Sequence, residues 1–339
     1  MEQHTAAGGP MMSAARIHRL GAPDAVGTDL VEVPVPGRGE VLVEVHAAAV
    51  NFPDTLMIAG EYQTPTPLPY IPGHEAAGIV GSPGPGATGI HVGDRVAVLA
   101  PHAFAEYVVA PADAVTPIPE GVGFAAAAAT WVCHLPAYHG LRSIAGVSAG
   151  DTVLVLGAGG GVGLAAVELA ATLGATVVAA ASSAAKLEAA RSKGAGVLID
   201  YRSGGLRDQL RDALGPGALE AVIDPVGGRY AEQALRELRW GATFVTVGYA
   251  SGEIPRIPLN LVRLKGAVIK GFEIRTFARY DPDSAARDRA ELEALWRNGR
   301  IEPAIHARYP LHRTREALEH VARRHSIGKT IIDVRDETR

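Results

Sequence analysis

The sequence contains a single cysteine and lacks any hydrophobic run of membrane-spanning length. Cys133 cannot form a disulfide within the chain, which is typical of proteins of the reducing cytoplasm. The most apolar stretches, 124–133 and 175–181, are shorter than the roughly 20 apolar residues that a membrane helix needs. The first 20 residues carry no apolar signal-peptide core. We therefore expect a soluble, cytoplasmic protein without a membrane partner.

The chain also lacks an excess of positive charge. Its 32 Lys and Arg residues face 36 Asp and Glu residues, which gives a net charge of −4. No basic run is interleaved with aromatic residues, so the sequence predicts no nucleic-acid partner.

At 339 residues the chain exceeds the usual size of one core, so two domains are expected. Residues 1–13 are predicted to form a flexible extension. From there to about 125 the sequence is rich in Pro and Gly, and short alternating segments predict a compact β barrel. The predicted strands are residues 40–50, 76–82, 94–100 and 105–111.

From residue 151, continuous apolar runs alternate with amphipathic helical patterns. This order predicts a parallel sheet covered on both faces, a doubly wound α/β fold of the Rossmann type. Five or six strands complete such a sheet, so the tail is expected to return to the first domain. The predicted limits are 14–135 with 276–339 for the catalytic domain, and 136–275 for the nucleotide-binding domain.

The segment TVLVLGAGGGVGLAAVELA, residues 152–170, places a glycine cluster between a buried strand and a helix. Glycines there let the backbone approach a diphosphate, and the helix start supplies N–H groups and a partial positive charge. The alternative is tight packing of strand against helix and nothing more. The residues predicted to bind the cofactor here are Ala158, Gly160, Gly161, Val162 and Gly163.

The end of the next strand favours NADPH over NADH. NAD sites usually carry an acidic residue there for the ribose hydroxyls, whereas this chain has Ser182 and Ser183. Lys186, one helical turn further on, could meet a 2′-phosphate as a point charge. Alternatively, Ser183 is simply a helix N-cap and Lys186 a solvated surface residue.

Several stretches resemble the medium-chain dehydrogenase/reductase superfamily, and within it the zinc-independent NADPH:quinone oxidoreductase branch that includes zeta-crystallin. The resemblance covers nearly the whole chain. It implies a GroES-like β-barrel catalytic domain and a Rossmann domain. The stretches that carry it are AAVNFPDTLMIAGEYQ, PGHEAAGIV, GDRVAV, AGGGVGLAAVELA, IDYRS and GKTIIDV.

The GHE triplet at 73–75 is where zinc-dependent members hold one metal ligand. Their first ligand is a cysteine in the segment that reads NFPD here, residues 51–54, so that ligand is missing, and Cys133 is displaced by one residue from the third position. A catalytic zinc needs at least three protein ligands, so no metal site is expected. His74 and Glu75 are instead expected to form hydrogen bonds within the barrel.

Without a Lewis acid, oxidation of an alcohol loses its usual assistance. Hydride delivery to an acceptor activated by conjugation remains, and there the cofactor carries the difficult step. We therefore predict NADPH-dependent reduction of a quinone or another α,β-unsaturated carbonyl. An enoyl-thioester or enone reductase is the nearest alternative, and a non-catalytic NADPH-binding protein is an alternative of another class.

The resemblance also implies roles for single residues. Asn51 would lie beside the nicotinamide ribose, and Tyr62 would either donate a proton or form a wall of the substrate cleft. Leu56 and Pro136 replace polar residues of some relatives, which leaves enones and enoyl thioesters open as substrates. Further cofactor contacts are implied for Tyr201, Gly248, Tyr249, Phe272 and Lys329.

The apolar segment AVIKGF, residues 267–272, is predicted to be an edge strand. An unpaired edge invites pairing with its copy across a two-fold axis, so a homodimer is expected.

Overall fold

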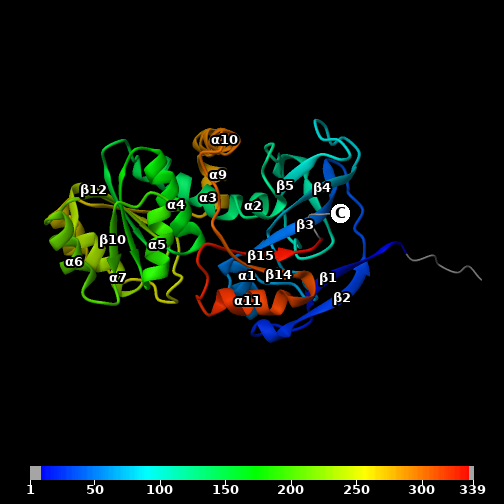
Figure 1. Cartoon of the computed structure of the whole chain (residues 1–339), viewed down its shortest axis with the longest axis horizontal. Helices are drawn as coiled ribbons and strands as arrows, with labels where there is room; N and C mark the ends of the chain where they lie inside the picture. Colours follow the sequence, from blue (N-terminus) through cyan, green and yellow to red (C-terminus); the bar gives the residue numbers. More distant parts are fainter. Residues whose placement is uncertain (1–8, 336–339) are drawn as a thin grey trace, which may run out of the picture. The chain divides into compact units, whose positions relative to one another are not determined.

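The computed structural model describes residues 9–335, which fold as two compact units (Figure 1). One unit contains the chain up to Trp131 and returns from Ile305 onward; the other comprises Val132–Ala304. The first is a β barrel and the second a parallel sheet with helices, so the predicted α/β fold class is confirmed.

A seven-stranded sheet forms the first unit. Its order is β14-β15-β3-β4-β5-β7, and β6 also pairs with β3. A two-stranded sheet of β1 and β2 accompanies it. The strands are β1 (Met11–Ile17), β2 (Val26–Glu32), β3 (Glu40–Val50), β4 (Glu75–Pro83), β5 (Arg95–Leu99), β6 (Tyr107–Pro111), β7 (Val115–Pro117), β14 (Ile305–Pro310) and β15 (Lys329–Asp333). Among the described residues this unit contains the α-helices α1 (Phe52–Ala59), α2 (Phe124–Ala128) and α11 (Thr314–Ala322).

Strand β3 organises the barrel because it pairs with three other strands. Its residues Val41, Val43 and Val45 are buried, as the period of two in a strand requires. On β4, a Cβ at Gly78 would lie 1.9 Å from the carbonyl oxygen of Glu44. Only glycine allows β3 and β4 to approach so closely. This approach sets the register of the two strands beside the polar site that contains Asn51 and Glu75.

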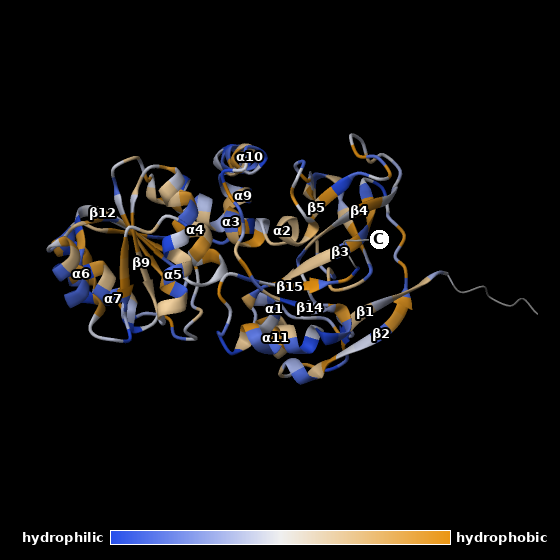
Figure 2. Cartoon of the chain, viewed as in Figure 1, coloured by the Kyte–Doolittle hydropathy of each residue, from blue (hydrophilic) through white to orange (hydrophobic). Residues whose placement is uncertain are grey.

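The second unit contains a six-stranded parallel sheet of order β10-β9-β8-β11-β12-β13, and its strands are largely apolar (Figure 2). This is the order of dinucleotide-binding folds, in which the direction of winding reverses between the first and fourth strands. Here that point lies between β8 and β11. The strands are β8 (Thr152–Leu156), β9 (Thr176–Ala181), β10 (Val197–Asp200), β11 (Leu219–Asp224), β12 (Leu238–Thr246) and β13 (Val268–Gly271).

Helices precede, connect and follow these strands. They are α3 (Trp131–His139), which continues as a π-helix (Gly140–Ala145), α4 (Gly161–Thr172), α5 (Ala184–Ser192), α6 (Leu206–Leu214), α7 (Arg229–Arg236), α8 (Leu259–Lys265), α9 (Ile274–Tyr280) and α10 (Pro282–Arg297). No helix of residues 9–335 is long and apolar enough to cross a membrane.

The unit limits differ from the predicted domains in one segment. Residues 276–304 group with the second unit, whereas the sequence placed them with the first. The cause is α10, whose Asp288 accepts a hydrogen bond from His139 and whose Glu291 accepts one from Tyr138. Leu292 of the same helix is fully buried. The chain therefore returns to the barrel at β14, about 30 residues later than predicted.

The amino-terminal limit of the first unit also differs from the predicted limit. Strand β1 begins at Met11 and pairs with β2, so the end of the predicted 1–13 extension is part of a sheet. Residues 1–8 lie outside the described part of the chain.

Candidate functional site

The glycine loop of the second unit joins β8 to α4. Gly157 has a φ of +60°, and a Cβ at Gly163 would lie 2.1 Å from the Gly157 carbonyl oxygen. Helix and strand therefore pack backbone against backbone. Gly160 is the N-cap, and Gly161 and Val162 begin the helix. The first N–H groups of a helix have no partner within it, which makes this end suited to a phosphate.

Ala158 lies inside the same loop. It is fully buried, and its N–H donates to the carbonyl oxygen of Ala180 on β9. This bond fixes the loop to the neighbouring strand. The five residues predicted from the glycine cluster are thus brought together at one end of the sheet.

The turn after β11 packs against this loop. A Cβ at Gly157 would meet the Val226 side chain at 2.5 Å. Asp224 ends β11, is fully buried, and accepts the N–H groups of Val226 and Gly227 at 2.8 Å each. Burial raises the pKa of the Asp224 carboxyl, and the two N–H groups oppose that rise. Sequence reasoning missed Asp224, although an Asp with Pro next and Gly three residues later, at a strand end, is typical of a side-chain-stabilised turn.

Gly248 and Tyr249 follow β12 on the other side of that turn. The Gly248 N–H donates to the carbonyl oxygen of Asp224, and the Tyr249 ring lies beside Gly227. Phe272 follows β13, and its ring lies edge-on to the ring of His139 in α3. These three residues thus follow the ends of two strands, and their contact with a cofactor stays a prediction.

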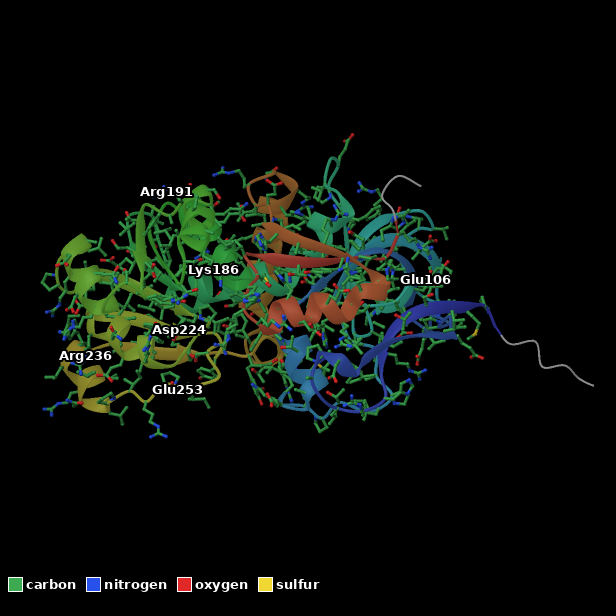
Figure 3. All side chains as sticks on the ribbon, turned by 60° about the horizontal axis from the view of Figure 1, so that its bottom comes forward. Glu106, Lys186, Arg191, Asp224, Arg236 and Glu253 are labelled. Carbon is green, nitrogen blue, oxygen red and sulfur yellow. The ribbon has the colours of Figure 1, made fainter. Side chains whose placement is uncertain are left out.

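The end of β9 carries the residues expected to select the cofactor. Ser183 caps α5 by accepting the Lys186 N–H, as the alternative interpretation anticipated. The aliphatic stem of Lys186, labelled in Figure 3, covers the glycine loop, because a Cβ at Gly159 would lie 2.4 Å from the Lys186 Cβ. Lys186 is therefore directed over the loop, and not away from it.

An aromatic pair lies next to this position. Tyr201 forms a hydrogen bond with Ser182, and its ring centroid is 4.3 Å from that of Tyr230. Burial, more than the nearby charges, raises the pKa of the Tyr201 hydroxyl. Arg229 donates to the Tyr230 hydroxyl at 2.8 Å and lies over its ring. Sequence reasoning identified Tyr201 and missed Arg229 and Tyr230.

In the first unit, Asn51, Glu75 and Lys329 form a buried network. The Lys329 ammonium donates to Asn51 Oδ1 at 2.5 Å and to Glu75 Oε1 at 2.6 Å, and Asn51 Nδ2 donates to the same Glu75 oxygen at 3.0 Å. The three residues flank adjacent strands: the end of β3, the start of β4 and the start of β15. Lys329 begins strand β15, and its ammonium pairs with Glu75 inside the barrel; its contact with a cofactor stays a prediction.

A second pair adjoins this network. Asp54 is buried on α1, and its two oxygens accept the Asn51 N–H and the His74 Nδ1–H, each at 2.7 Å. The Tyr70 hydroxyl lies 3.5 Å from His74 Nε2. Burial and the Asp54 charge raise the pKa of the Tyr70 hydroxyl above its usual range. His74 and Glu75 thus form hydrogen bonds within the barrel, as expected from the sequence.

Tyr62 follows α1 and is half-buried against the barrel core. Leu56, on α1, is likewise half-buried. The Tyr62 ring packs among apolar residues, which matches the position of a wall residue, and its role as a proton donor stays a prediction.

The residues of the first unit do not fit a zinc ion. The Asn51 amide is engaged by Lys329 and Glu75. His74 has one ring nitrogen committed to Asp54. Within residues 9–335, no group of three or more His, Cys, Asp or Glu is arranged to hold a metal.

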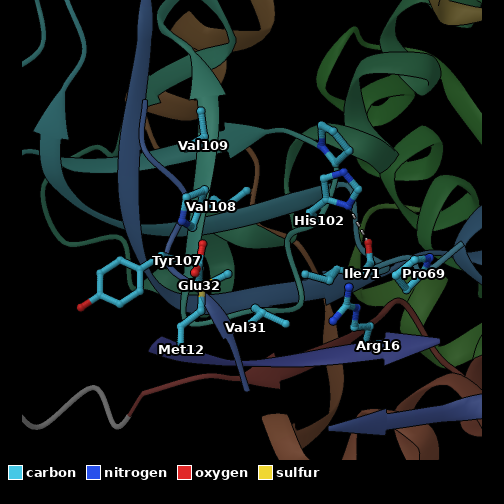
Figure 4. A pocket seen from close by; sticks show the side chains of 12 residues that line it. Met12, Arg16, Val31, Glu32, Pro69, Ile71, His102, Tyr107, Val108 and Val109 are labelled. Carbon is cyan, nitrogen blue, oxygen red and sulfur yellow. Dashed lines mark hydrogen bonds between the residues drawn. The ribbon is translucent and has the colours of Figure 1, made fainter. Parts of the chain in front are cut away.

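A separate hollow of about 270 Å³ lies on the barrel near β1, β2 and β6 (Figure 4). Its polar residues include Arg16, which pairs with Asp29 at 3.7 Å, and His102, whose ring nitrogen bonds to the carbonyl oxygen of Ile71. The lining contains no member of the Asn51–Glu75–Lys329 network and neither Asp54 nor His74.

Comparison with known proteins identifies the class of fold. The family model for the alcohol dehydrogenase GroES-like domain matches residues 37–120, and the model for zinc-binding dehydrogenase matches residues 161–288. The chain is 33% identical to the quinone oxidoreductase-like protein 2 homolog of Nematostella vectensis, over 95% of this chain and 89% of that one. It is 30% identical to human quinone oxidoreductase, over 96% and 98% of the two chains.

A comparison with solved structures supports the same family. The structure of Escherichia coli quinone oxidoreductase complexed with NADPH superposes with a TM-score of 0.86 at 28% identity, covering 95% of this chain and 99% of that one. The chain therefore belongs to the medium-chain dehydrogenase/reductase family, as a quinone oxidoreductase-like member, and it is an enzyme of the oxidoreductase class.

The buried network yields a stability prediction. Replacing Lys329 by Met leaves the Glu75 carboxylate buried without its cation, which should lower the free energy of unfolding of the barrel by about 3–5 kcal/mol. The double variant Lys329→Met with Glu75→Gln removes both charges and should recover most of that loss. Urea unfolding of the three proteins measures the difference. Equal midpoints for the wild type and the single variant would show that the pair does not stabilise the barrel.

Proposed function

We propose that the chain is an NADPH-dependent reductase that transfers hydride to a quinone or another conjugated carbonyl without a catalytic metal. The observation that carries this proposal is the Asn51–Glu75–Lys329 network. Its donor set, an amide, a carboxylate and an ammonium, does not suit zinc, and within residues 9–335 no group of three or more His, Cys, Asp or Glu is arranged to hold a metal. An acceptor that is already activated by conjugation does not require a Lewis acid.

The second unit supplies the proposed cofactor site. The glycine loop and the start of α4 would hold the diphosphate, and Ser182, Lys186 and Tyr201 would meet the 2′-phosphate. The end of β9 presents no carboxylate that would repel that phosphate. When bound, NADPH supplies the hydride. The Arg229 guanidinium beside Tyr230 adds positive charge near the same position.

The first unit supplies the proposed polar groups for the substrate end of the reaction. Asn51, fixed by Lys329 and by Asp54, would orient the nicotinamide ribose. Negative charge develops on the carbonyl oxygen as hydride is added, so a hydrogen-bond donor lowers the barrier. Tyr62 is the donor that the family resemblance favours.

A second candidate is the reduction of enoyl thioesters. The half-buried Leu56 on α1 replaces a tyrosine of some quinone reductases, and it makes that surface more apolar. Both candidates use NADPH and a conjugated acceptor, but the acceptor differs, so a comparison of substrates separates them.

Initial rates of NADPH oxidation with 1,4-benzoquinone, 3-buten-2-one and crotonyl-CoA test the proposal, with NADH as the alternative reductant. NADPH should be preferred. Lys186→Ala should raise the KM for NADPH about tenfold, the effect of losing one charge-assisted contact, and leave the KM for NADH unchanged. Arg191→Ala, a change of an exposed residue on the same helix, is the matched control.

Two outcomes would count against the proposal. Tight NADPH binding with no oxidation by any acceptor would identify a non-catalytic NADPH-binding protein. Preferential turnover of crotonyl-CoA would favour the enoyl-thioester reductase.

We further propose that the enzyme acts as a homodimer in the cytoplasm. Strand β13 pairs with β12 on one side, and all four of its residues are exposed, with Ile269 40% accessible. Apolar side chains on an unpaired edge favour pairing with a second copy of the strand. The cytoplasmic assignment is supported by the single cysteine.

Replacing Ile269 by Asp places a charge at the centre of this edge and should convert the dimer to single chains. Light scattering coupled to size-exclusion chromatography would report the mass. Val92→Asp, at an exposed apolar residue of the barrel unit, is the control and should leave the dimer intact. A wild-type protein that elutes with the mass of one chain would refute the homodimer.

A further inference from the structure

The hollow near β1, β2 and β6 is lined mainly by apolar side chains. It measures about 270 Å³, close to the lower end of small-molecule sites, which begin at about 300 Å³. Met12 on β1 is buried in its lining, and Val31, Ile71 and Val109 are half-buried there (Figure 4). Water therefore contacts apolar surface in the hollow, and covering that surface favours an apolar ligand.

The wall of the hollow offers few backbone donors. Pro34, Pro69 and Pro101 contribute to the lining, and proline has no N–H. His102 adds a ring whose Nδ1–H donates to the Ile71 carbonyl oxygen at 3.0 Å, which fixes the ring in place. A wall of this kind does not suit a ligand that is polar along its length.

Arg16 of β1 brings a guanidinium to this lining. Its salt bridge to Asp29 is long, at 3.7 Å, and the same carboxylate oxygen lies 2.7 Å from His18 Nε2. Arg16 Nε is buried and has no hydrogen-bond partner within residues 9–335. The guanidinium is therefore incompletely satisfied by the protein, and a carboxylate is the group that binds a guanidinium through two parallel hydrogen bonds.

Glu32 of β2 places the opposite charge at the other end of the hollow. In the pairing of β1 with β2, Arg16 lies opposite Gly27, and Glu32 is five residues beyond Gly27. At 3.3 Å per residue these positions are about 17 Å apart. The Glu32 side chain is exposed and, like that of Arg16, lines the hollow (Figure 4). An anionic group is thus attracted at one end and repelled at the other.

We propose that this hollow binds an aliphatic monocarboxylate, a fatty acid of medium chain length. The carboxylate pairs with Arg16, and the chain lies along Ile71, Val31 and Met12 toward Glu32. An apolar lining with a cation at one end is complementary to a molecule that carries one acid group on an apolar chain. The carboxylate of Glu32 disfavours a second acid group at the far end of the chain.

A cationic amphiphile bound in the opposite direction, with its ammonium at Glu32, is the alternative. The Glu32 carboxylate is exposed and solvated, so an ion pair there gains little. The Arg16 side chain is only 28% exposed, and one of its donors is buried without a partner. These observations favour the anion. The inference does not depend on the proposed function, because the lining contains no member of the Asn51–Glu75–Lys329 network.

Isothermal titration calorimetry with decanoate at pH 8, where the acid is ionised, tests the proposal. Arg16→Gln should weaken the binding of decanoate about tenfold, the effect of losing one charge-assisted contact. 1-Decanol, which has the same chain without the charge, should bind to the wild type more weakly than decanoate. Arg38→Gln changes an exposed arginine outside the lining and is the matched control, which should leave the affinity unchanged.

Decanedioate tests the charge at the far end of the hollow. It carries a carboxylate at each end of the same chain, so it should bind to the wild type more weakly than decanoate. Glu32→Gln removes the repelling charge and should reduce this difference. Glu120→Gln, a change of an exposed glutamate outside the lining, should leave the difference as it is.

Carbon-13 NMR of the methionine methyl groups locates the ligand. Decanoate should shift the Met12 methyl signal, assigned from the spectrum of Met12→Leu, because this side chain lines the hollow. The Met57 signal, from α1, should stay unchanged, since Met57 is not part of the lining. This readout distinguishes the hollow from any other apolar surface of the enzyme.

Three results would overturn the proposal. The first is the absence of decanoate binding at millimolar concentration. The second is binding that Arg16→Gln does not weaken or that leaves the Met12 signal unshifted. The third is binding of decanedioate or decylamine as tight as that of decanoate. A wild type that oxidises no NADPH with any acceptor would refute the proposed function and leave this inference standing.

Discussion

A buried charge network holds the polar side chains of the barrel unit in fixed positions. Lys329 and Glu75 neutralise each other inside the barrel, and together they hold the amide of Asn51. Asn51 in turn anchors Asp54 through its backbone N–H, and Asp54 holds His74. The charges of Lys329, Glu75 and Asp54 would each be costly to bury alone, because an isolated charge in the interior loses its solvation. The network is thus a fixed polar site built from protein charges.

The second unit depends on a different constraint, the close approach of backbones at the glycine loop. Gly163 lies against the Gly157 carbonyl, and Gly157 lies against Val226 of the neighbouring turn. Two strand ends and one helix start therefore converge where the winding of the sheet reverses. This is the place where α/β sheets bind nucleotides, since helix N–H groups and small residues leave room for a phosphate. Lys186 adds a cation over the same loop.

Much of the fold and the glycine loop could be predicted from the sequence, because the patterns that indicate them lie within short segments. The strand at 40–50 and the glycine loop follow from side-chain period and from glycine chemistry within one segment, and both agree with β3 and with the start of α4. The buried network could not be predicted in the same way. Lys329 and Asn51 are 278 positions apart, and only the pairing of β15 with β3 brings them together. Residues 276–304 were misplaced because a helical pattern does not reveal which surface it covers, and α10 covers α3.

We propose that this enzyme reduces a conjugated carbonyl with NADPH and without a metal. The most direct measurement is the rate of NADPH oxidation by 1,4-benzoquinone after exhaustive dialysis of the protein against a strong zinc chelator. The account predicts the same rate before and after dialysis and no gain when zinc is added. A rate that is lost on dialysis and restored by stoichiometric zinc would contradict it.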